Sequence, residues 1–220
     1  MPRKRAVIIL DMDGVISDTQ RVNSELEIML LREHGIEMST DELTARFDGA
    51  PERACAEIIF REHGKPVDLD KFVEEKLTRL TESARGRVTA IEGSLDLIRK
   101  LKENHFKLAI ASSSRSDFIE LVLSELRIKD QFDVLTNGRE VRLGKPSPDI
   151  FLLTAAKLKV APQDCVVIED SKNGVIAAKR AGMRCIWLNN QESFGESEFL
   201  PDVKVKSLRE LEIEEFFIEG

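Results

Sequence analysis

The stretch IILDMDGVISDT, residues 8–19, starts as an apolar run and passes into two aspartates with one residue between them. The run AVIIL at 6–10 is typical of a short strand that is buried on both faces. Asp11 and Asp13 follow it, and Gly14 permits a sharp turn that brings both carboxyls to one site. Because two like charges at the end of a buried strand repel each other, the sequence predicts a positive partner there.

Similar apolar runs recur along the chain, with helical patterns between them. Further strands are expected at 106–111, 132–135, 165–168 and 184–188. Helices are expected at 94–102, 116–125, 148–158 and 171–181, with Ser94 as the cap of the first and Gly182 as the stop of the last. Strands that alternate with helices predict an α/β fold, in which helices cover both faces of a parallel sheet.

Residues 19–85 break this rhythm, because they hold helical patterns and no convincing strand. The apolar positions that recur on one helix face are Val22, Leu26, Met29 and Leu30, and further helix candidates are 57–62 and 71–80. The economical interpretation is an all-helical subdomain inserted after the first strand. We therefore expect a core of residues 1–17 and 86–220 and a helical cap of residues 18–85.

Composition and charge exclude several function classes. The 220 residues are 42% hydrophobic and 33% charged, which is typical of a globular protein, and the net charge of -7 argues against nucleic acid or an anionic membrane as partner. The basic start precedes an apolar run too short for a signal peptide, and no run reaches the about 20 residues of a membrane span. The scattered Cys55, Cys165 and Cys185 favour buried thiols over disulfides. We therefore expect a cytoplasmic monomer that binds neither nucleic acid nor a membrane.

The residues just after each predicted strand form the candidate site, because ligands of an open parallel sheet bind beyond the carboxyl ends of its strands. Besides Asp11 and Asp13, these residues are Ser112, Ser113, Ser114, Arg115, Glu169 and Asp170. After the strand at 132–135 the chain first passes through 136–138 and then reaches Lys145. Each segment alone has a structural explanation, as a turn, a helix cap, a loop or an acidic helix start. Their arrival together after successive strands favours a catalytic site.

The grouped side chains suit phosphoryl transfer. Lys145 compensates one acidic charge, and a hard divalent cation, Mg²⁺, is the natural complement of the others. One carboxylate can attack phosphorus, while the lysine and the hydroxyls hold the phosphoryl oxygens. A second carboxyl two residues further can carry the proton.

Four segments resemble the haloacid dehalogenase superfamily, in its subgroup of phosphatases and beta-phosphoglucomutase-like enzymes. They are DMDGVISDT at 11–19, LAIASSS at 108–114, GKPSPDIF at 144–151 and IEDSKNGVIAAKRAG at 168–182. The resemblance covers nearly the whole chain. It implies a Rossmann-like core with a helical cap inserted after the first of these segments.

The resemblance also implies roles for individual residues. Asp11 would be the nucleophile and Asp13 the general acid and base. Ser112, Ser113 and Lys145 would hold the phosphoryl group. Since dehalogenases of the superfamily lack the second aspartate and phosphonate-cleaving members replace it, Asp13 favours phosphoryl transfer.

A magnesium site is implied at the same place. Asp11 and Asp170 would ligate Mg²⁺ by their carboxylates and Asp13 by its main-chain carbonyl. Glu169 would lie close to the metal and act partly through water.

Substrate choice in this subgroup resides in the cap, where the segment 47–53 resembles the substrate-facing loop. Asn23, Arg53 and Lys76 are the candidate substrate contacts, although Arg53 and Lys76 also suit solvated helix charges. Beta-phosphoglucomutases commonly carry a histidine where this chain has Asn23, and their loop arginine aligns nearer Glu52 than Arg53. Both departures weigh against mutase activity.

The sequence therefore predicts a Mg²⁺-dependent phosphatase that hydrolyses a small phosphorylated metabolite, with a sugar phosphate as the leading class, through an aspartyl-phosphate. A phosphosugar mutase is the alternative. A non-catalytic binding protein on the same fold is a minor one, because clustered carboxylates without a task only cost stability.

Overall fold

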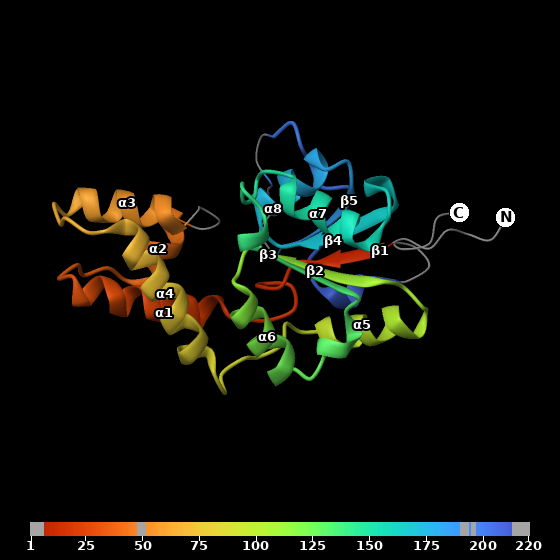
Figure 1. Cartoon of the computed structure of the whole chain (residues 1–220), viewed down its shortest axis with the longest axis horizontal. Helices are drawn as coiled ribbons and strands as arrows, with labels where there is room; N and C mark the ends of the chain where they lie inside the picture. The colour runs from red at the N-terminus through yellow and green to blue at the C-terminus, as the bar shows by residue number, and fades with distance from the viewer. Residues whose placement is uncertain (1–6, 48–51, 190–193, 195–196, 213–220) are drawn as a thin grey trace. The chain divides into compact units, whose positions relative to one another are not determined.

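A computed structural model describes residues 7–47, 52–189, 194 and 197–212 (Figure 1). The chain divides into two compact units, one of Met1–Asp18 with Thr89–Gly220 and one of Thr19–Val88. We call them the core unit and the helical unit. The boundaries expected from the sequence, after residues 17 and 85, lie within three residues of these.

The core unit is built on a six-stranded sheet in the order β3-β2-β1-β4-β5-β6. Its strands are β1 (Val7–Leu10), β2 (Leu108–Ser112), β3 (Val134–Asn137), β4 (Cys165–Glu169), β5 (Arg184–Leu188) and β6 (Val203–Val205). All the pairings are parallel, and the central Ile9 of β1 lies between Ala109 of β2 and Val167 of β4. The sequence did not predict β6, which is only three residues long and apolar at two of them.

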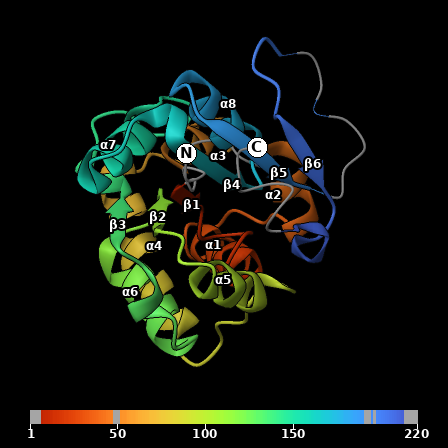
Figure 2. The same cartoon turned by 90° about the vertical axis from the view of Figure 1, so that its right-hand side faces the viewer.

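Helices cover both faces of the sheet (Figures 1 and 2). They are α5 (Ser94–Glu103) and α6 (Ser116–Glu125) on one face and α7 (Asp149–Leu158) and α8 (Lys172–Arg180) on the other. Short 3-10 helices are η1 (Lys129–Gln131), η2 (Gly138–Glu140), η3 (Pro162–Asp164) and η4 (Leu208–Glu210). The predicted α/β fold, a Rossmann-like parallel sheet between two helical layers, is therefore confirmed.

The apolar runs form strands because both of their faces are covered. β1, β2 and β4 are buried at every position. Ile9 and Val167 pack with Phe151 of α7 and Val175 of α8 in one apolar cluster. This packing fixes the carboxyl ends of the three central strands side by side.

One predicted helix cap is wrong. The residue that precedes α5 is Gly93, with a φ of 85°, and no side chain caps the helix. Ser94 is already helical and buried, and its hydroxyl donates to the carbonyl of Ile16 at 3.1 Å. The serine therefore ties α5 to the turn after β1.

The helical unit contains α1 (Gln20–Glu33), α2 (Thr40–Phe47), α3 (Glu52–Glu62) and α4 (Leu69–Ala84). The face of α1 predicted from Val22, Leu26 and Leu30 is buried, whereas Met29 is 41% exposed and does not belong to it. Phe60 of α3 and Phe72 of α4 meet edge to face at 5.0 Å between ring centroids. No helix among the described residues is long and apolar enough to cross a membrane.

The three cysteines are buried free thiols, as predicted.

Candidate active site

The turn after β1 directs both aspartates. The main-chain N–H of Asp11 donates to Ile168 at 3.0 Å, so the register with β4 continues past the end of the strand. The N–H of Gly14 donates to Ser17 at 2.9 Å and closes the turn. Gly14 has a φ of 83°, and a Cβ there would collide with the carboxylate of Asp170. Glycine is therefore needed for both its backbone conformation and its small size.

Lys145 joins the ends of three strands. Its Nζ donates to Asp11 Oδ1 at 2.5 Å, to Glu169 Oε1 at 2.6 Å and to the carbonyl of Ala111 at 3.2 Å. The side chain is only 8% exposed. All three ammonium hydrogens thus have acceptors, and the lysine holds β1, β2 and β4 together at the site.

Glu169 has protein donors on both oxygens. Its Oε2 accepts from the main-chain N–H of Ser171 at 2.8 Å and from the Ser171 hydroxyl at 2.9 Å. Ser171 caps α8 by accepting from the N–H of Gly174, where a Cβ would collide with the Glu169 carboxylate. Because Lys145 and Ser171 already donate to this carboxylate, the contacts do not favour direct ligation of a metal by Glu169, and its expected place close to the metal, acting partly through water, stays a prediction. The position of Glu169 suits the positive end of the α8 dipole.

The three serines after β2 differ in their surroundings. Ser112 is buried, and its hydroxyl accepts from the N–H of Ser114 at 3.1 Å. The Ser114 hydroxyl donates to Asp13 Oδ2 at 2.9 Å. Ser113 is exposed, and its carbonyl lies against Gly138. The roles implied by the resemblance omitted Ser114, although the two-residue alternation of a strand end puts it on the side of Ser112.

The acidic groups raise one another's pKa. Burial raises the pKa of Asp11 to about 7; Glu169 and Asp13 add to the rise, and Lys145 opposes it. Burial also raises the pKa of Asp170 to about 9, with contributions from Glu169 and Asp11. Burial is the larger cause, and the repulsion among the neighbouring carboxylates adds to it. The single ammonium of Lys145 does not balance these carboxylates, and such an excess calls for further positive charge.

The donors present fit Mg²⁺. Carboxylate and main-chain carbonyl oxygens are the ligands this ion prefers, and it commonly keeps several waters. Among the described residues no three acidic, histidine or cysteine side chains form a ready cluster. The ligand set that the resemblance implies, the carboxylates of Asp11 and Asp170 with the Asp13 carbonyl, stays a prediction, and water would complete the shell of the ion.

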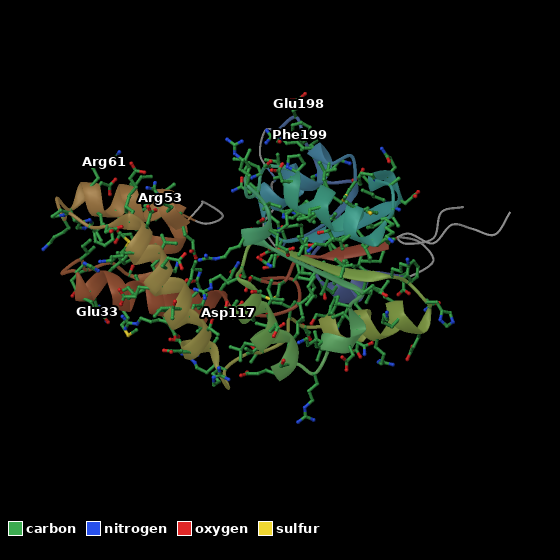
Figure 3. All side chains as sticks on the ribbon, in the orientation of Figure 1. Glu33, Arg53, Arg61, Asp117, Glu198 and Phe199 are labelled. Atoms are coloured by element: carbon green, nitrogen blue, oxygen red, sulfur yellow. The ribbon has the colours of Figure 1, made fainter. Side chains whose placement is uncertain are left out.

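The two basic candidates of the cap have acidic partners in the helical unit. Arg53 is 59% exposed and donates to Asp70 at 3.0 Å, on the surface of the unit (Figure 3). Lys76 is only 2% exposed, and its Nζ lies 2.7 Å from Glu27 and 3.1 Å from Glu52. Lys76 is therefore not a solvated helix charge, and that alternative is wrong. Its contact with a substrate gains no support from the structure, because two glutamates hold the ammonium.

Asn23 differs from both, because its side-chain oxygen is buried and has no hydrogen-bond partner among the described residues. Residues 48–51 of the expected substrate-facing loop lie outside the described residues.

Comparisons with known proteins agree with this geometry. The family model described as haloacid dehalogenase-like hydrolase matches residues 8–188. Hexitol phosphatase B of Escherichia coli K12 is 31% identical over 216 residues, which cover 96% of both chains. The phosphorylated carbohydrates phosphatase of Thermotoga maritima is 33% identical over 82% of this chain and 83% of its own.

Among solved structures, beta-phosphoglucomutase of Clostridium difficile superposes with a TM-score of 0.78 and 28% identity, over 95% of this chain and 94% of its own. The sequence match, the topology and the grouping of acidic side chains at the strand ends lead to one assignment. The chain belongs to the haloacid dehalogenase-like hydrolase family, within its subgroup of phosphatases that resemble beta-phosphoglucomutase.

Proposed function

We propose that this enzyme is a Mg²⁺-dependent phosphatase that hydrolyses a sugar phosphate or sugar-alcohol phosphate through an aspartyl-phosphate on Asp11. The observation that carries the proposal is the ammonium of Lys145, which joins Asp11 to Glu169 while Asp13 lies two residues further at the same strand end. The named substrates of two relatives, hexitol phosphates and phosphorylated carbohydrates, support the substrate class.

In the first step, a carboxylate oxygen of Asp11 attacks the phosphorus of the monoester. A bond forms between this oxygen and phosphorus, and the bond from phosphorus to the sugar oxygen breaks. Asp13 donates its proton to that oxygen, so the sugar leaves as a neutral alcohol. The hydroxyl of Ser112, the main-chain N–H of Ser113 and Lys145 hold the phosphoryl oxygens.

In the second step, water attacks the phosphorus of the aspartyl-phosphate on Asp11. Asp13, now a carboxylate, takes a proton from this water, and the bond between phosphorus and the Asp11 oxygen breaks. Inorganic phosphate leaves, and both aspartates return to their starting states.

The carboxylates of Asp11 and Asp170 and the main-chain carbonyl of Asp13 would hold Mg²⁺. When bound, the ion supplies positive charge that keeps the carboxyls of Asp11 and Asp170 ionised and neutralises charge on the phosphoryl group.

Replacement of Asp11 tests the proposal. Asp11→Asn should abolish turnover of 4-nitrophenyl phosphate in the presence of Mg²⁺. Asp130→Asn is the matched control, since Asp130 is exposed in η1 and outside the site, and it should retain full activity. Turnover by folded Asp11→Asn at a tenth of the wild-type rate or more would contradict the proposal.

A panel of phosphorylated metabolites tests the substrate class. Hexose and hexitol phosphates should give the highest kcat/KM, ahead of nucleotides and phosphoamino acids. We propose Asn23 as an acceptor for a substrate hydroxyl, on the ground of its unpartnered buried oxygen. Asn23→Ala should then raise KM for the preferred substrate more than it lowers kcat.

A phosphosugar mutase is the second candidate, favoured by the likeness to beta-phosphoglucomutase. Incubation with beta-glucose 1-phosphate and a bisphosphate primer separates the two. Release of free phosphate supports the phosphatase, and formation of glucose 6-phosphate without release supports the mutase. We do not retain the non-catalytic alternative, because the relatives are enzymes.

We also propose that the enzyme acts as a monomer in the cytoplasm, where its three buried thiols would stay reduced. Light scattering tests the oligomeric state.

A further inference from the structure

Trp187 of β5 makes a directed contact with the segment that carries Asp170. Its indole Nε1 donates to the main-chain carbonyl of Asp170 at 2.7 Å, and the side-chain amide of Asn189 approaches the same oxygen at 3.3 Å. Trp187 is 1% exposed. A buried indole N–H requires an acceptor, so the ring and the carbonyl fix each other.

The ring itself is held on two sides. Phe194 meets it edge to face at 4.8 Å between centroids, and the ammonium of Lys204 lies 5.0 Å from its centroid. Trp187 is also the register partner of Glu169 in the neighbouring strand β4. The indole N–H therefore acts on Asp170 from a rigid part of the sheet.

A second contact confines Asp170. Its carboxylate lies where a Cβ of residue 14 would be, and only glycine leaves that space. A small displacement of the Asp170 main chain would move the carboxylate relative to Asp11. Two carboxylates that share a cation must hold their spacing against mutual repulsion.

We infer that Trp187 is a positioning residue for the metal site: its indole N–H, through the Asp170 carbonyl, sets the affinity for Mg²⁺ and leaves the chemical step unchanged. The inference rests on the proposed function, because it takes Asp170 as a ligand of Mg²⁺. Removal of a partner that bonds a ligating group directly typically lowers metal affinity by about 10- to 100-fold. Since Trp187 acts through the main chain of the ligand, we expect an effect at the lower end of this range.

Trp187→Phe tests the inference, since it removes the N–H and keeps an aromatic ring. The Kd for Mg²⁺, measured by calorimetry without substrate, should rise about tenfold, or about 1.4 kcal/mol. The kcat at saturating Mg²⁺ should stay within threefold of wild type. The matched control is Lys204→Met, which removes the ammonium over the ring and keeps the N–H; its Kd should stay within twofold of wild type. A purely structural role for Trp187 would lower the free energy of unfolding and leave the Kd unchanged, which would overturn the inference.

Wild-type fluorescence gives a second measurement that does not depend on folding of the variant. Trp187 is the only tryptophan, and the chain has no tyrosine. Mg²⁺ should change its emission with a midpoint equal to the calorimetric Kd, and Asp170→Asn should abolish the change. Emission that does not respond to Mg²⁺ would overturn the inference.

The outcomes also separate this inference from the proposed function. If Trp187→Phe weakens Mg²⁺ binding but the wild type hydrolyses no phosphate monoester, the inference stands and the proposed function fails. If the wild type hydrolyses such esters and Trp187→Phe binds Mg²⁺ normally, only the inference fails. A wild-type protein that takes up no Mg²⁺ would overturn both.

Discussion

Each of the two units contains a buried lysine that bridges two carboxylates. Lys145 of the core unit bridges Asp11 and Glu169, and Lys76 of the helical unit bridges Glu27 and Glu52. Taken as single residues, they look alike.

Their surroundings differ in charge balance. Two more carboxylates, those of Asp13 and Asp170, interact with this group, and the pKa values of Asp11 and Asp170 are raised. Beside Lys76, Glu52 is 35% exposed, so water shares in its solvation. Burial alone would lower the pKa of Lys76, but Glu52 and Glu27 outweigh burial and raise it. The difference is therefore the number of carboxylates left over. A buried lysine in a group of four carboxylates indicates a binding site, whereas one held by two glutamates, one of them partly exposed, indicates packing.

The largest expected difference between the clusters is in activity. Lys145→Met should lower kcat/KM by about 10³-fold, because it removes positive charge from the transferring group. Lys76→Met should keep kcat/KM within about threefold in the folded protein, because its ammonium faces only protein carboxylates. Steady-state kinetics on one sugar phosphate measures both. Equal losses of kcat/KM in the two variants would contradict the assignment of Lys145 to the site and of Lys76 to packing.

Of the two lysine substitutions, Lys76→Met should have the larger effect on the free energy of unfolding. Lys76→Met leaves Glu27 and Glu52 without their shared partner and should lower the free energy of unfolding by about 3 kcal/mol. Urea unfolding measures the change, and adding Glu27→Gln to Lys76→Met should restore part of it. A normal unfolding energy with a tenfold higher KM would instead identify Lys76 as a substrate contact.

The pH dependence of stability tests the charge excess in the core unit. Because the folded-state pKa values of Asp11 and Asp170 lie above the ordinary 3.8, the stability that these groups contribute is present below about pH 4. It is lost as the pH rises through about 7 for Asp11 and about 9 for Asp170.

Urea unfolding in chelator should therefore show a loss of several kcal/mol between pH 5 and 8, because each pH unit between the unfolded and the folded pKa costs about 1.4 kcal/mol per group. Mg²⁺ should restore it at pH 8 and change little at pH 5, and Asp170→Asn should flatten the slope in chelator. Stabilisation by Mg²⁺ that does not vary with pH would contradict the charge-excess explanation.

The smallest expected effect concerns two buried neutral hydroxyls, one with a hydrogen-bond partner and one without. Thr136 and Thr154 are both buried; the Thr154 hydroxyl donates to Ile150 at 2.7 Å, and the Thr136 hydroxyl has no partner among the described residues. Thr154→Val should lower the free energy of unfolding by about 1 kcal/mol, and Thr136→Val should leave it equal or higher. Calorimetric unfolding of both variants checks this, and a larger loss for Thr136→Val would contradict it.

Much of the core site was predictable because strand ends are readable from local pattern. Asp11 and Glu169 directly follow apolar runs, and parallel pairing must bring such ends together. Lys145 lies in the loop beyond β3 and was predictable from the resemblance of its segment. The partners of Lys76 were not predictable, because Glu27 and Glu52 lie on other helices and meet it only through packing. The bond from Ser114 to Asp13 depends on side-chain geometry, which residue spacing does not specify.

Gly174 sets a limit on engineering this protein. Replacing a glycine inside a helix by alanine is a standard way to gain about 1 kcal/mol of stability. At Gly174 this substitution should fail, because the added methyl group would displace Glu169, which holds Lys145. A thermostable variant must therefore be sought at other helices, and a library that randomises position 174 should return glycine wherever activity is selected.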